Sequence, residues 1–92
     1  MPTREQIDKA WTNAKEIRGK DPEQYRQDPY GNAMYRDSYG KDSKRGWEVD
    51  HIKPVAKGGS DVTRNLQALN FRVNREKGNS LVKRSRHSKS NQ

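Results

Sequence analysis

The sequence has no cysteine, and this absence removes two kinds of stabilising structure at once. Without thiols the chain forms no disulfide bond, and every zinc site built on thiolates is excluded. Two histidines are also too few for a catalytic zinc held by three imidazoles. A structural zinc is therefore not expected, and packing and hydrogen bonds must hold the fold.

Apolar residues are scarce as well. They make up 27% of the 92 residues, and only twelve positions are Val, Ile, Leu or Phe. No stretch approaches the roughly 18 consecutive apolar residues of a membrane span, and no apolar segment of the kind found in a secretory signal peptide follows Met1. We expect one small α+β domain with a thin core, cytoplasmic and away from membranes, although delivery as a toxin stays open.

Positive charge is what the sequence has in excess. Lys and Arg number 20 against 12 Asp and Glu, which gives a formal net charge of +8. From Val62 onwards there are eight basic residues and one acidic residue, Glu76. Such one-sided charge favours a polyanionic partner, because each phosphate that is neutralised releases condensed counterions. Residues 83–92 are expected to form a basic, disordered tail.

The first segment is predicted to be a helix over residues 3–18. Thr3 and Gln6 have the spacing of a capping box, and Gly19 would end the helix. Apolar residues recur at helical spacing along one side, which predicts a buried stripe with Trp11 as its largest member. The stripe consists of Ile7, Ala10, Trp11, Ala14 and Ile17.

Residues 20–46 are rich in turn-forming pairs and contain four tyrosines. Tyrosines near a basic surface can stack on bases, but in a chain this poor in aliphatics they are predicted to serve as substitute core. A short strand is expected over 33–39. Residues 1–46 would therefore support the rest of the domain. The tyrosines are Tyr25, Tyr30, Tyr35 and Tyr39.

The second half has a clearer pattern of strand, loop, strand and helix. Aliphatic or aromatic residues alternate with polar ones at the start of the first strand, glycines mark the loop, and Gly78 stands at the expected end of the helix. Asn70 is interpreted as a helix N-terminal residue. The four segments are 47–52, 57–61, 66–69 and 70–77.

Four residues of this half are candidates for chemistry. Asp50 and His51 end the first strand, Asn65 precedes the second strand, and Asn74 lies on the helix. A carboxylate beside an imidazole, in a domain whose positive charge favours phosphate binding, suggests metal-assisted phosphodiester hydrolysis. Carboxylate and amide oxygens suit Mg2+ or Mn2+, and an imidazole that is mostly neutral at physiological pH suits a general base.

The run WEVDHIKPVAKGGSDVTRNLQALNFRVNREKG, residues 47–78, resembles the HNH endonucleases. Their ββα-metal motif has the form DHI.P...GG.....NL..L...CN..KG, and the spacing agrees: His51 and Asn65 are 14 positions apart, and Asn65 and Asn74 are 9 apart. The resemblance covers about a third of the chain. It implies an N-terminal amphipathic helix packed with a ββα-metal motif over 47–82, all in one domain.

The resemblance also implies a role for each matched residue. Asp50 is a metal ligand, His51 is the general base that activates water, and Asn65 braces the loop and so orients the base. Asn74 stands where the last His of the family name stands and is the second ligand, which favours Mg2+ over Zn2+. Neighbouring strand residues point to opposite faces, so the metal and the base would approach one phosphate from different sides.

The function implied is metal-dependent hydrolysis of DNA phosphodiester bonds. It would use one divalent ion, with Mg2+ preferred and Mn2+ as the alternative. A homodimer or larger assembly is left open, because a single ββα site cuts one strand. The alternative function is a non-catalytic nucleic-acid-binding module on the same fold. The basic residues expected to contact DNA are Lys53, Arg72, Arg75 and Lys77.

Two departures from the family pattern concern the scaffold and the metal. Many members carry CxxC pairs that bind a structural zinc, and one pair would fall at Asn70 and Val73, which hold no thiol. The extra helix histidine of colicin-type sites is replaced by Gly78. Two protein ligands and several waters would remain, an arrangement that Mg2+ accepts.

Overall fold

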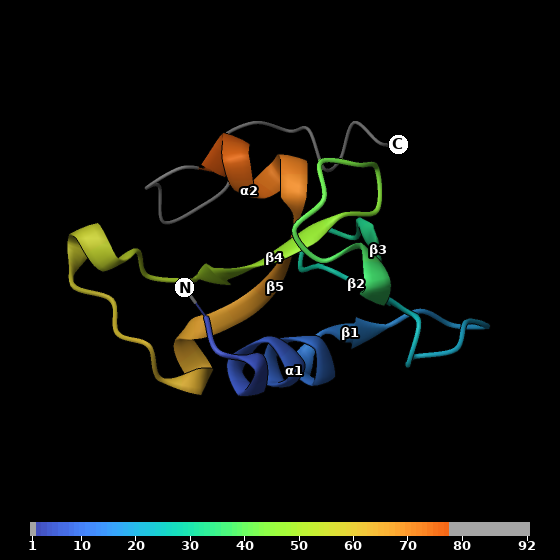
Figure 1. The fold of residues 1–92 in the computed structure, drawn as a ribbon, viewed down its shortest axis with the longest axis horizontal. Coiled ribbons are helices and arrows are strands. Elements are labelled where there is room, and N and C mark those ends of the chain that lie inside the picture. Colours follow the sequence, from blue (N-terminus) through green and yellow to red (C-terminus); the bar gives the residue numbers. More distant parts are fainter. Residues whose placement is uncertain (1, 78–92) are drawn as a thin grey trace.

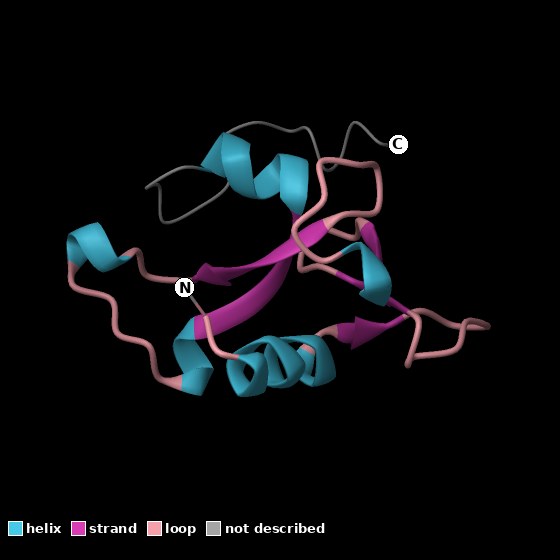
Figure 2. Ribbon diagram, in the orientation of Figure 1, coloured by secondary structure: helices cyan, strands magenta, loops and turns pink. Residues whose placement is uncertain are grey.

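An antiparallel pair of strands, β4 and β5, lies between two helices, α1 on one side and α2 on the other (Figures 1 and 2). The computed structural model describes residues 2–77. The expected helix cap at Gly78, the end of the 47–82 segment and the basic tail at 83–92 lie outside these residues. The described elements are α1 (Arg4–Asn13), β1 (Lys15–Glu16), β2 (Tyr25–Gln27), β3 (Ala33–Tyr35), β4 (Trp47–His51), β5 (Leu66–Asn70) and α2 (Phe71–Lys77).

Helix α1 begins where the sequence predicts. The side chain of Thr3 accepts a hydrogen bond from the Gln6 backbone N–H at 3.1 Å, and the Gln6 side chain accepts one from the Thr3 N–H at 2.8 Å. This capping box satisfies two N–H groups that the first turn of a helix leaves without partners. The predicted start is confirmed.

The predicted end of the helix at residue 18 is wrong. Helix α1 stops at Asn13, Ala14 is extended, and the next two residues pair with β2. The cause lies in Arg26, whose guanidinium Nη1 atom donates to the carbonyl oxygens of Thr12 and Ala14 at 3.0 and 2.9 Å. A side chain from β2 thus occupies carbonyls at the point where the helix ends, a contact that helical periodicity does not encode.

The strands form two separate antiparallel sheets. Strands β1, β2 and β3 form one sheet in chain order. The strand expected over 33–39 is shorter, because the chain leaves β3 in a 3₁₀ turn over Arg36–Ser38. In the second sheet, Trp47 pairs with Asn70 and His51 pairs with Leu66. The predicted order of strand, loop, strand and helix is confirmed.

The core is built around two tryptophans. Trp11 and Trp47 are each 1% exposed and lie with ring centroids 4.9 Å apart. Each indole Nε1–H donates to a backbone carbonyl, so burying these rings leaves no donor unpaired. Met34, Ala10 and Ala68 complete the cluster.

The tyrosines play a smaller part than the sequence suggests. Tyr39 packs edge-on against Trp47, at 4.9 Å between centroids, and is the one tyrosine in contact with the tryptophan cluster. Tyr25 and Tyr35 instead face each other across β2 and β3 at 5.1 Å. The prediction of tyrosines as substitute core is therefore right for Tyr39 alone, because two indoles already fill the centre.

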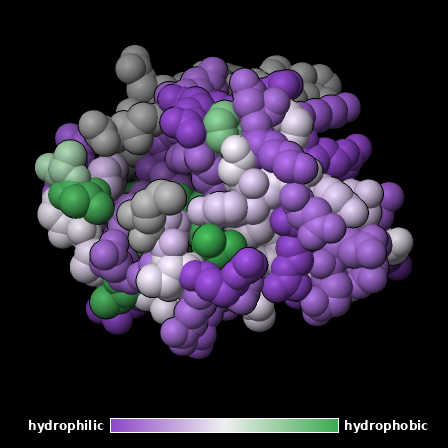
Figure 3. Space-filling view, viewed as in Figure 1, coloured by the Kyte–Doolittle hydropathy of each residue, from purple (hydrophilic) through white to green (hydrophobic). Residues whose placement is uncertain are grey.

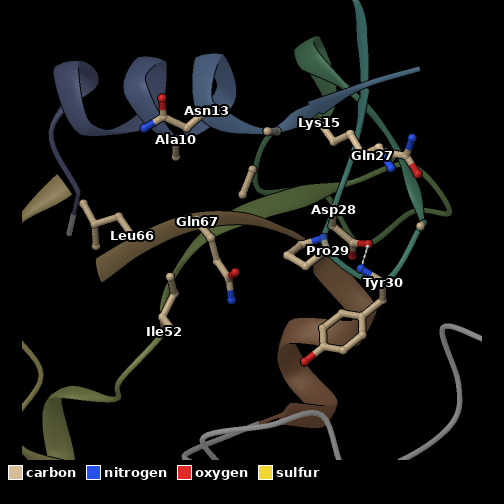
Figure 4. Close-up of a pocket in the computed structure, with 13 residues that line it drawn as sticks. Ala10, Asn13, Lys15, Gln27, Asp28, Pro29, Tyr30, Ile52, Leu66 and Gln67 are labelled. Carbon is tan, nitrogen blue, oxygen red and sulfur yellow. Dashed lines mark hydrogen bonds between the residues drawn. The ribbon is translucent and has the colours of Figure 1, made fainter. Parts of the chain in front are cut away.

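A buried carboxylate ties the two halves of the chain together. Asp28, 2% exposed, accepts hydrogen bonds from the backbone N–H groups of Tyr30, Asn32 and Asn70, the first of which is drawn in Figure 4. Asn70 in turn accepts from the N–H groups of Arg72 and Val73, so it caps α2 as interpreted from the sequence. Hydrogen bonds thus hold the junction between β5 and α2.

Together the helices and sheets form a small, compact domain of the predicted α+β class. The face seen in Figure 3 is mostly hydrophilic with separate hydrophobic spots, as the composition leads one to expect. Neither helix in residues 2–77 has the length and apolar character needed to cross a membrane. The boundary expected between 1–46 and 47–82 stays a prediction.

Candidate active site

A cavity of about 250 Å³ opens where β4 ends, between that strand, the following loop and α2. Its polar lining comes from four residues, three of which the sequence singles out as catalytic or metal-binding. They are Asp50, His51, Asn74 and Lys77. The fold therefore brings the candidate base and both candidate metal ligands to one place.

Asp50 is almost fully buried, with 7% exposure, and both of its carboxylate oxygens have partners. Its Oδ1 atom accepts from Lys77 Nζ at 3.2 Å, and its Oδ2 atom accepts from Gln67 Nε2 at 2.8 Å. Gln67 is the cross-strand neighbour of Asp50 in the β4–β5 register, which places the two side chains on one face.

Lys77 lies inside the cavity wall instead of on the outer surface of α2. Its side chain is 1% exposed, and its Nζ atom also donates to the backbone carbonyl of His51 at 3.0 Å. Buried charges are tolerated when they are paired and hydrogen-bonded. Lys77 is therefore a fixed cation next to Asp50, and its expected contact with a phosphate stays a prediction.

His51 is held from the opposite side by the loop. Its Nε2 atom lies 2.6 Å from Oδ1 of Asp61, and its side chain is 30% exposed. An ionised carboxylate only accepts hydrogen bonds, so Nε2 carries the proton in this pair and Nδ1 of a neutral ring is left as an acceptor. The side chains of Asp50 and His51 thus have partners in different elements although both residues line the cavity.

Asn74 is oriented by a strand residue. Its Nδ2 atom donates to Glu48 Oε1 at 2.8 Å, and Oε2 of the same carboxylate accepts from Arg75 at 2.9 Å. Because the amide nitrogen is engaged with Glu48, the carbonyl oxygen is left for other partners. That oxygen is the atom of Asn74 that a hard cation would bind.

Asn65 acts on the loop and does not line the cavity. Its Oδ1 atom accepts from the Lys53 N–H at 2.8 Å, and its Nδ2 atom donates to the carbonyls of Lys53 and Ser60 at 3.1 and 2.7 Å. These bonds fix both ends of the loop that begins directly after His51. Gly59 fits beneath them, since a Cβ there would lie 1.7 Å from the Lys53 carbonyl oxygen.

Residues 38–80 match the family model of HNH endonucleases. Over these residues the chain is similar to an HNH endonuclease domain. This match confirms the resemblance seen in the sequence and indicates a nuclease-type function for the domain. Nucleases of this family act on DNA and usually bind a divalent metal. No curated protein and no solved structure gives a significant match to the chain.

The outer surface of the HNH domain carries the remaining basic candidates. Arg72 is 54% exposed and donates to Asp42 at 3.0 Å. Arg75 is 64% exposed, pairs with Glu48 and lies over the Phe71 ring. Surface pairs of this kind are weak and exchange readily. Lys53 is also exposed.

Sequence reasoning missed three residues that hold the candidate site in place. Glu48 shares the strand face of Asp50, two positions away, and Gln67 stands opposite it, so strand period and register would have located both. Asp61 lies in an irregular loop, where no sequence pattern predicts its contact with His51.

The charges around the HNH domain also affect one phenol. Burial raises the pKa of the Tyr39 hydroxyl, and the negative charge of Glu48 raises it further, while a backbone hydrogen bond from Val49 acts in the opposite direction. Tyr39 therefore stays protonated at neutral pH.

Within residues 2–77, no three His, Cys, Asp or Glu side chains come together as a metal centre. The oxygen donors available in the cavity are those of Asp50 and Asn74. This donor set is compatible with Mg2+, which keeps several waters and uses one or two protein ligands.

Proposed function

We propose that this protein is a metal-dependent endonuclease that hydrolyses phosphodiester bonds of DNA, with the cavity at the end of β4 as its active site. The observation that carries the proposal is the convergence of Asp50, His51 and Asn74 on one cavity within an HNH domain. Each of the three is held by a separate hydrogen bond from a neighbouring element.

Asp50 and Asn74 would hold one divalent ion. Mg2+ is the preferred ion, and Mn2+ is the alternative. Each carboxylate oxygen of Asp50 accepts one hydrogen bond, Oδ1 from Lys77 and Oδ2 from Gln67, which leaves a further lone pair on each oxygen. When bound, such an ion supplies electrostatic stabilisation of the charge that develops on the phosphate and the leaving oxygen.

His51 would act as the general base. With Nε2 donating to Asp61, the free Nδ1 atom takes a proton from a water molecule, and Asp61 stabilises the imidazolium that results. The hydroxide so formed would attack phosphorus in line with the 3′-oxygen, which would leave with the electron pair of the broken P–O bond and take a proton from solvent. The products would carry 5′-phosphate and 3′-hydroxyl ends. Asn65 would keep the loop, and with it Asp61 and His51, in position.

DNA would approach over the exposed basic side chains. Lys53 lies on the loop after β4, and Arg75 lies on α2 next to Asn74, whereas Arg72, also on α2, lines a separate hollow with Lys44 and Arg45. A phosphate could replace Asp42, the exposed carboxylate that now pairs with Arg72, because such surface pairs contribute at most about 1 kcal/mol. The formal net charge of +8 favours this encounter.

The test is incubation of purified protein with supercoiled plasmid, with Mg2+ and with EDTA. We expect nicking that requires the metal, and a loss of at least about 100-fold in the His51→Ala variant, with DNA affinity close to wild type. His87→Ala, a change at the only other histidine, is the matched control. Undiminished cutting by His51→Ala would contradict the role of His51.

The same experiment distinguishes the proposed nuclease from the alternative, a module that binds nucleic acid without cutting it. A non-catalytic nucleic-acid-binding module would bind the plasmid tightly and leave it intact under every metal condition. Linear product that appears only after nicked product would indicate two independent encounters, whereas direct linearisation would favour a dimer.

A further inference from the structure

The candidate active site already contains a cation of its own, the ammonium group of Lys77. Its Nζ atom lies 3.2 Å from Oδ1 of Asp50, one of the two proposed metal ligands, and the two side chains are 1% and 7% exposed. Little water therefore lies around this pair to screen it. A second cation that binds to Asp50 is repelled by the ammonium more strongly than it would be at the protein surface.

Lys77 is fixed in this position by a second contact and by the packing of its helix. The Nζ atom also donates to the backbone carbonyl of His51 at 3.0 Å. Val73, one helical turn earlier on α2, is fully buried and anchors the helix in the core. An ammonium that left would give up two acceptors in a buried place, so an ion at Asp50 has to share the carboxylate with Lys77.

The other charges near the cavity leave this balance in place. Among the described residues that line the cavity, Asp50 is the one acid and Lys77 is the one lysine or arginine. Two further acids lie next to lining residues, and each is engaged with a partner of its own: Glu48 with Arg75 and Asp61 with His51. The buried negative charge that would attract a divalent ion is thus largely neutralised by Lys77.

We propose that Lys77 is an internal competitor of the divalent ion: it is the counter-cation of Asp50 while no metal is bound, and its charge lowers the affinity of the site for the metal. The inference rests on the proposed nuclease function and adds what sets the strength of its metal requirement. Lys77 acts through Asp50, so it is a positioning residue. The ion would be held firmly only when a substrate phosphate adds its own negative charge to the site.

The experiment measures Mn2+ binding in the absence of DNA, from the electron paramagnetic resonance signal of the free ion. We expect Lys77→Met to bind Mn2+ at least about 10-fold more tightly than the wild-type protein, because a buried repulsive charge is removed. Disruption of the site would weaken Mn2+ binding, so a gain in affinity is a result that a merely structural role of Lys77 does not give.

Three variants serve as controls for this gain. Lys77→Arg keeps the positive charge and should bind Mn2+ no more tightly than the wild-type protein. Arg75→Met removes a cation that is 64% exposed and lies next to Asn74, and it should change the affinity by less than about threefold, because solvent screens that charge. Asp50→Asn combined with Lys77→Met removes the proposed ligand and reports Mn2+ bound elsewhere on the protein.

Thermal unfolding gives a second readout, because Lys77→Met is expected to be less stable than the wild-type protein. A ligand that binds only the folded state stabilises that state in proportion to the logarithm of its affinity. Mn2+ should therefore raise the Tm of Lys77→Met by more than it raises the Tm of the wild-type protein. A Lys77→Met chain that stays unfolded in Mn2+ would contradict the inference, since the ion would then fail to replace the ammonium.

Two results would overturn the inference and leave the nuclease proposal standing. One is Mn2+ binding by Lys77→Met that is no tighter than that of a wild-type protein which nicks plasmid with metal. The other is an equal gain in Lys77→Arg and Lys77→Met. If neither the wild-type protein nor Lys77→Met binds more Mn2+ than Asp50→Asn with Lys77→Met, and plasmid stays intact, the proposed function fails and the inference fails with it.

Discussion

At the residue scale, the least expected contact is the buried ion pair between Lys77 and Asp50, at 3.2 Å. Lys77→Met would leave the Asp50 carboxylate buried without its cation, and we expect a loss of roughly 3–5 kcal/mol in the free energy of unfolding. Urea denaturation measures this loss. The pair of Arg75 with Glu48, 64% and 20% exposed, is the comparison, and Arg75→Met should cost less, about 1 kcal/mol, because the arginine is largely in solvent.

A double variant removes the charge of both residues in the buried ion pair. Asp50→Asn combined with Lys77→Met removes the unpaired charge and should regain most of the lost stability. If the single variant Lys77→Met is as stable as the wild-type protein, then Lys77 and Asp50 are not a buried pair in solution.

At the scale of elements, the loop between β4 and β5 positions the site through its backbone. In Gly59→Ala, the new Cβ would meet the Lys53 carbonyl, so the loop that holds Asp61 against His51 must shift. We expect plasmid cutting to fall at least roughly 10-fold, because a displacement of about 1 Å costs up to about 100-fold. The cost in stability should stay within about 1–3 kcal/mol.

A second glycine separates displacement of the loop from general strain. Gly19 has a positive φ, +82°, unlike Gly59, and has open space around it. Gly19→Ala should therefore cost backbone strain of about 1–2 kcal/mol and leave the cutting rate unchanged at temperatures where the protein stays folded. A wild-type rate in Gly59→Ala would show that the loop does not position the base.

The elements that could be predicted from the sequence are those whose pattern is local. Alternation in 47–52 and the pair Leu69 and Val73 predict β4, β5 and α2, because burial on one face dictates residue type at fixed spacing. The sheet of β1, β2 and β3 could not be predicted, because its strands are two or three residues long and show no period.

For the candidate site, residue identity was predictable and its surroundings were not. Spacing and family resemblance place Asp50, His51 and Asn74 at one cavity, as the structure has them. The partners Asp61 and Lys77 depend on how a loop folds and how deep a helix sits against β4. Those features arise from tertiary packing, which overrides the expectation that a helical lysine faces solvent.

At the scale of the whole molecule, the excess of positive charge should govern affinity. We expect the logarithm of the DNA-binding constant to fall linearly with the logarithm of salt concentration, with a slope near −0.9 for each phosphate contacted. Fluorescence anisotropy between low and moderate salt measures this slope. Replacing an exposed arginine, as in Arg72→Ala, should reduce the slope by about one unit, and a flat salt response would remove the electrostatic argument.

The hydrogen bonds of Asp28 determine how the protein can be divided. Its carboxylate joins the turn after β2 to the backbone of Asn70, and the indole of Trp47 donates to the carbonyl of Arg36. If residues 47–77 were excised, the backbone N–H of Asn70 and the indole N–H of Trp47 would lose their acceptors. The face of β4 and β5 that α1 now covers would also become exposed. Residues 47–77 are consequently not expected to fold when separated from residues 2–46, so a transplant of this segment into another protein would have to include both parts.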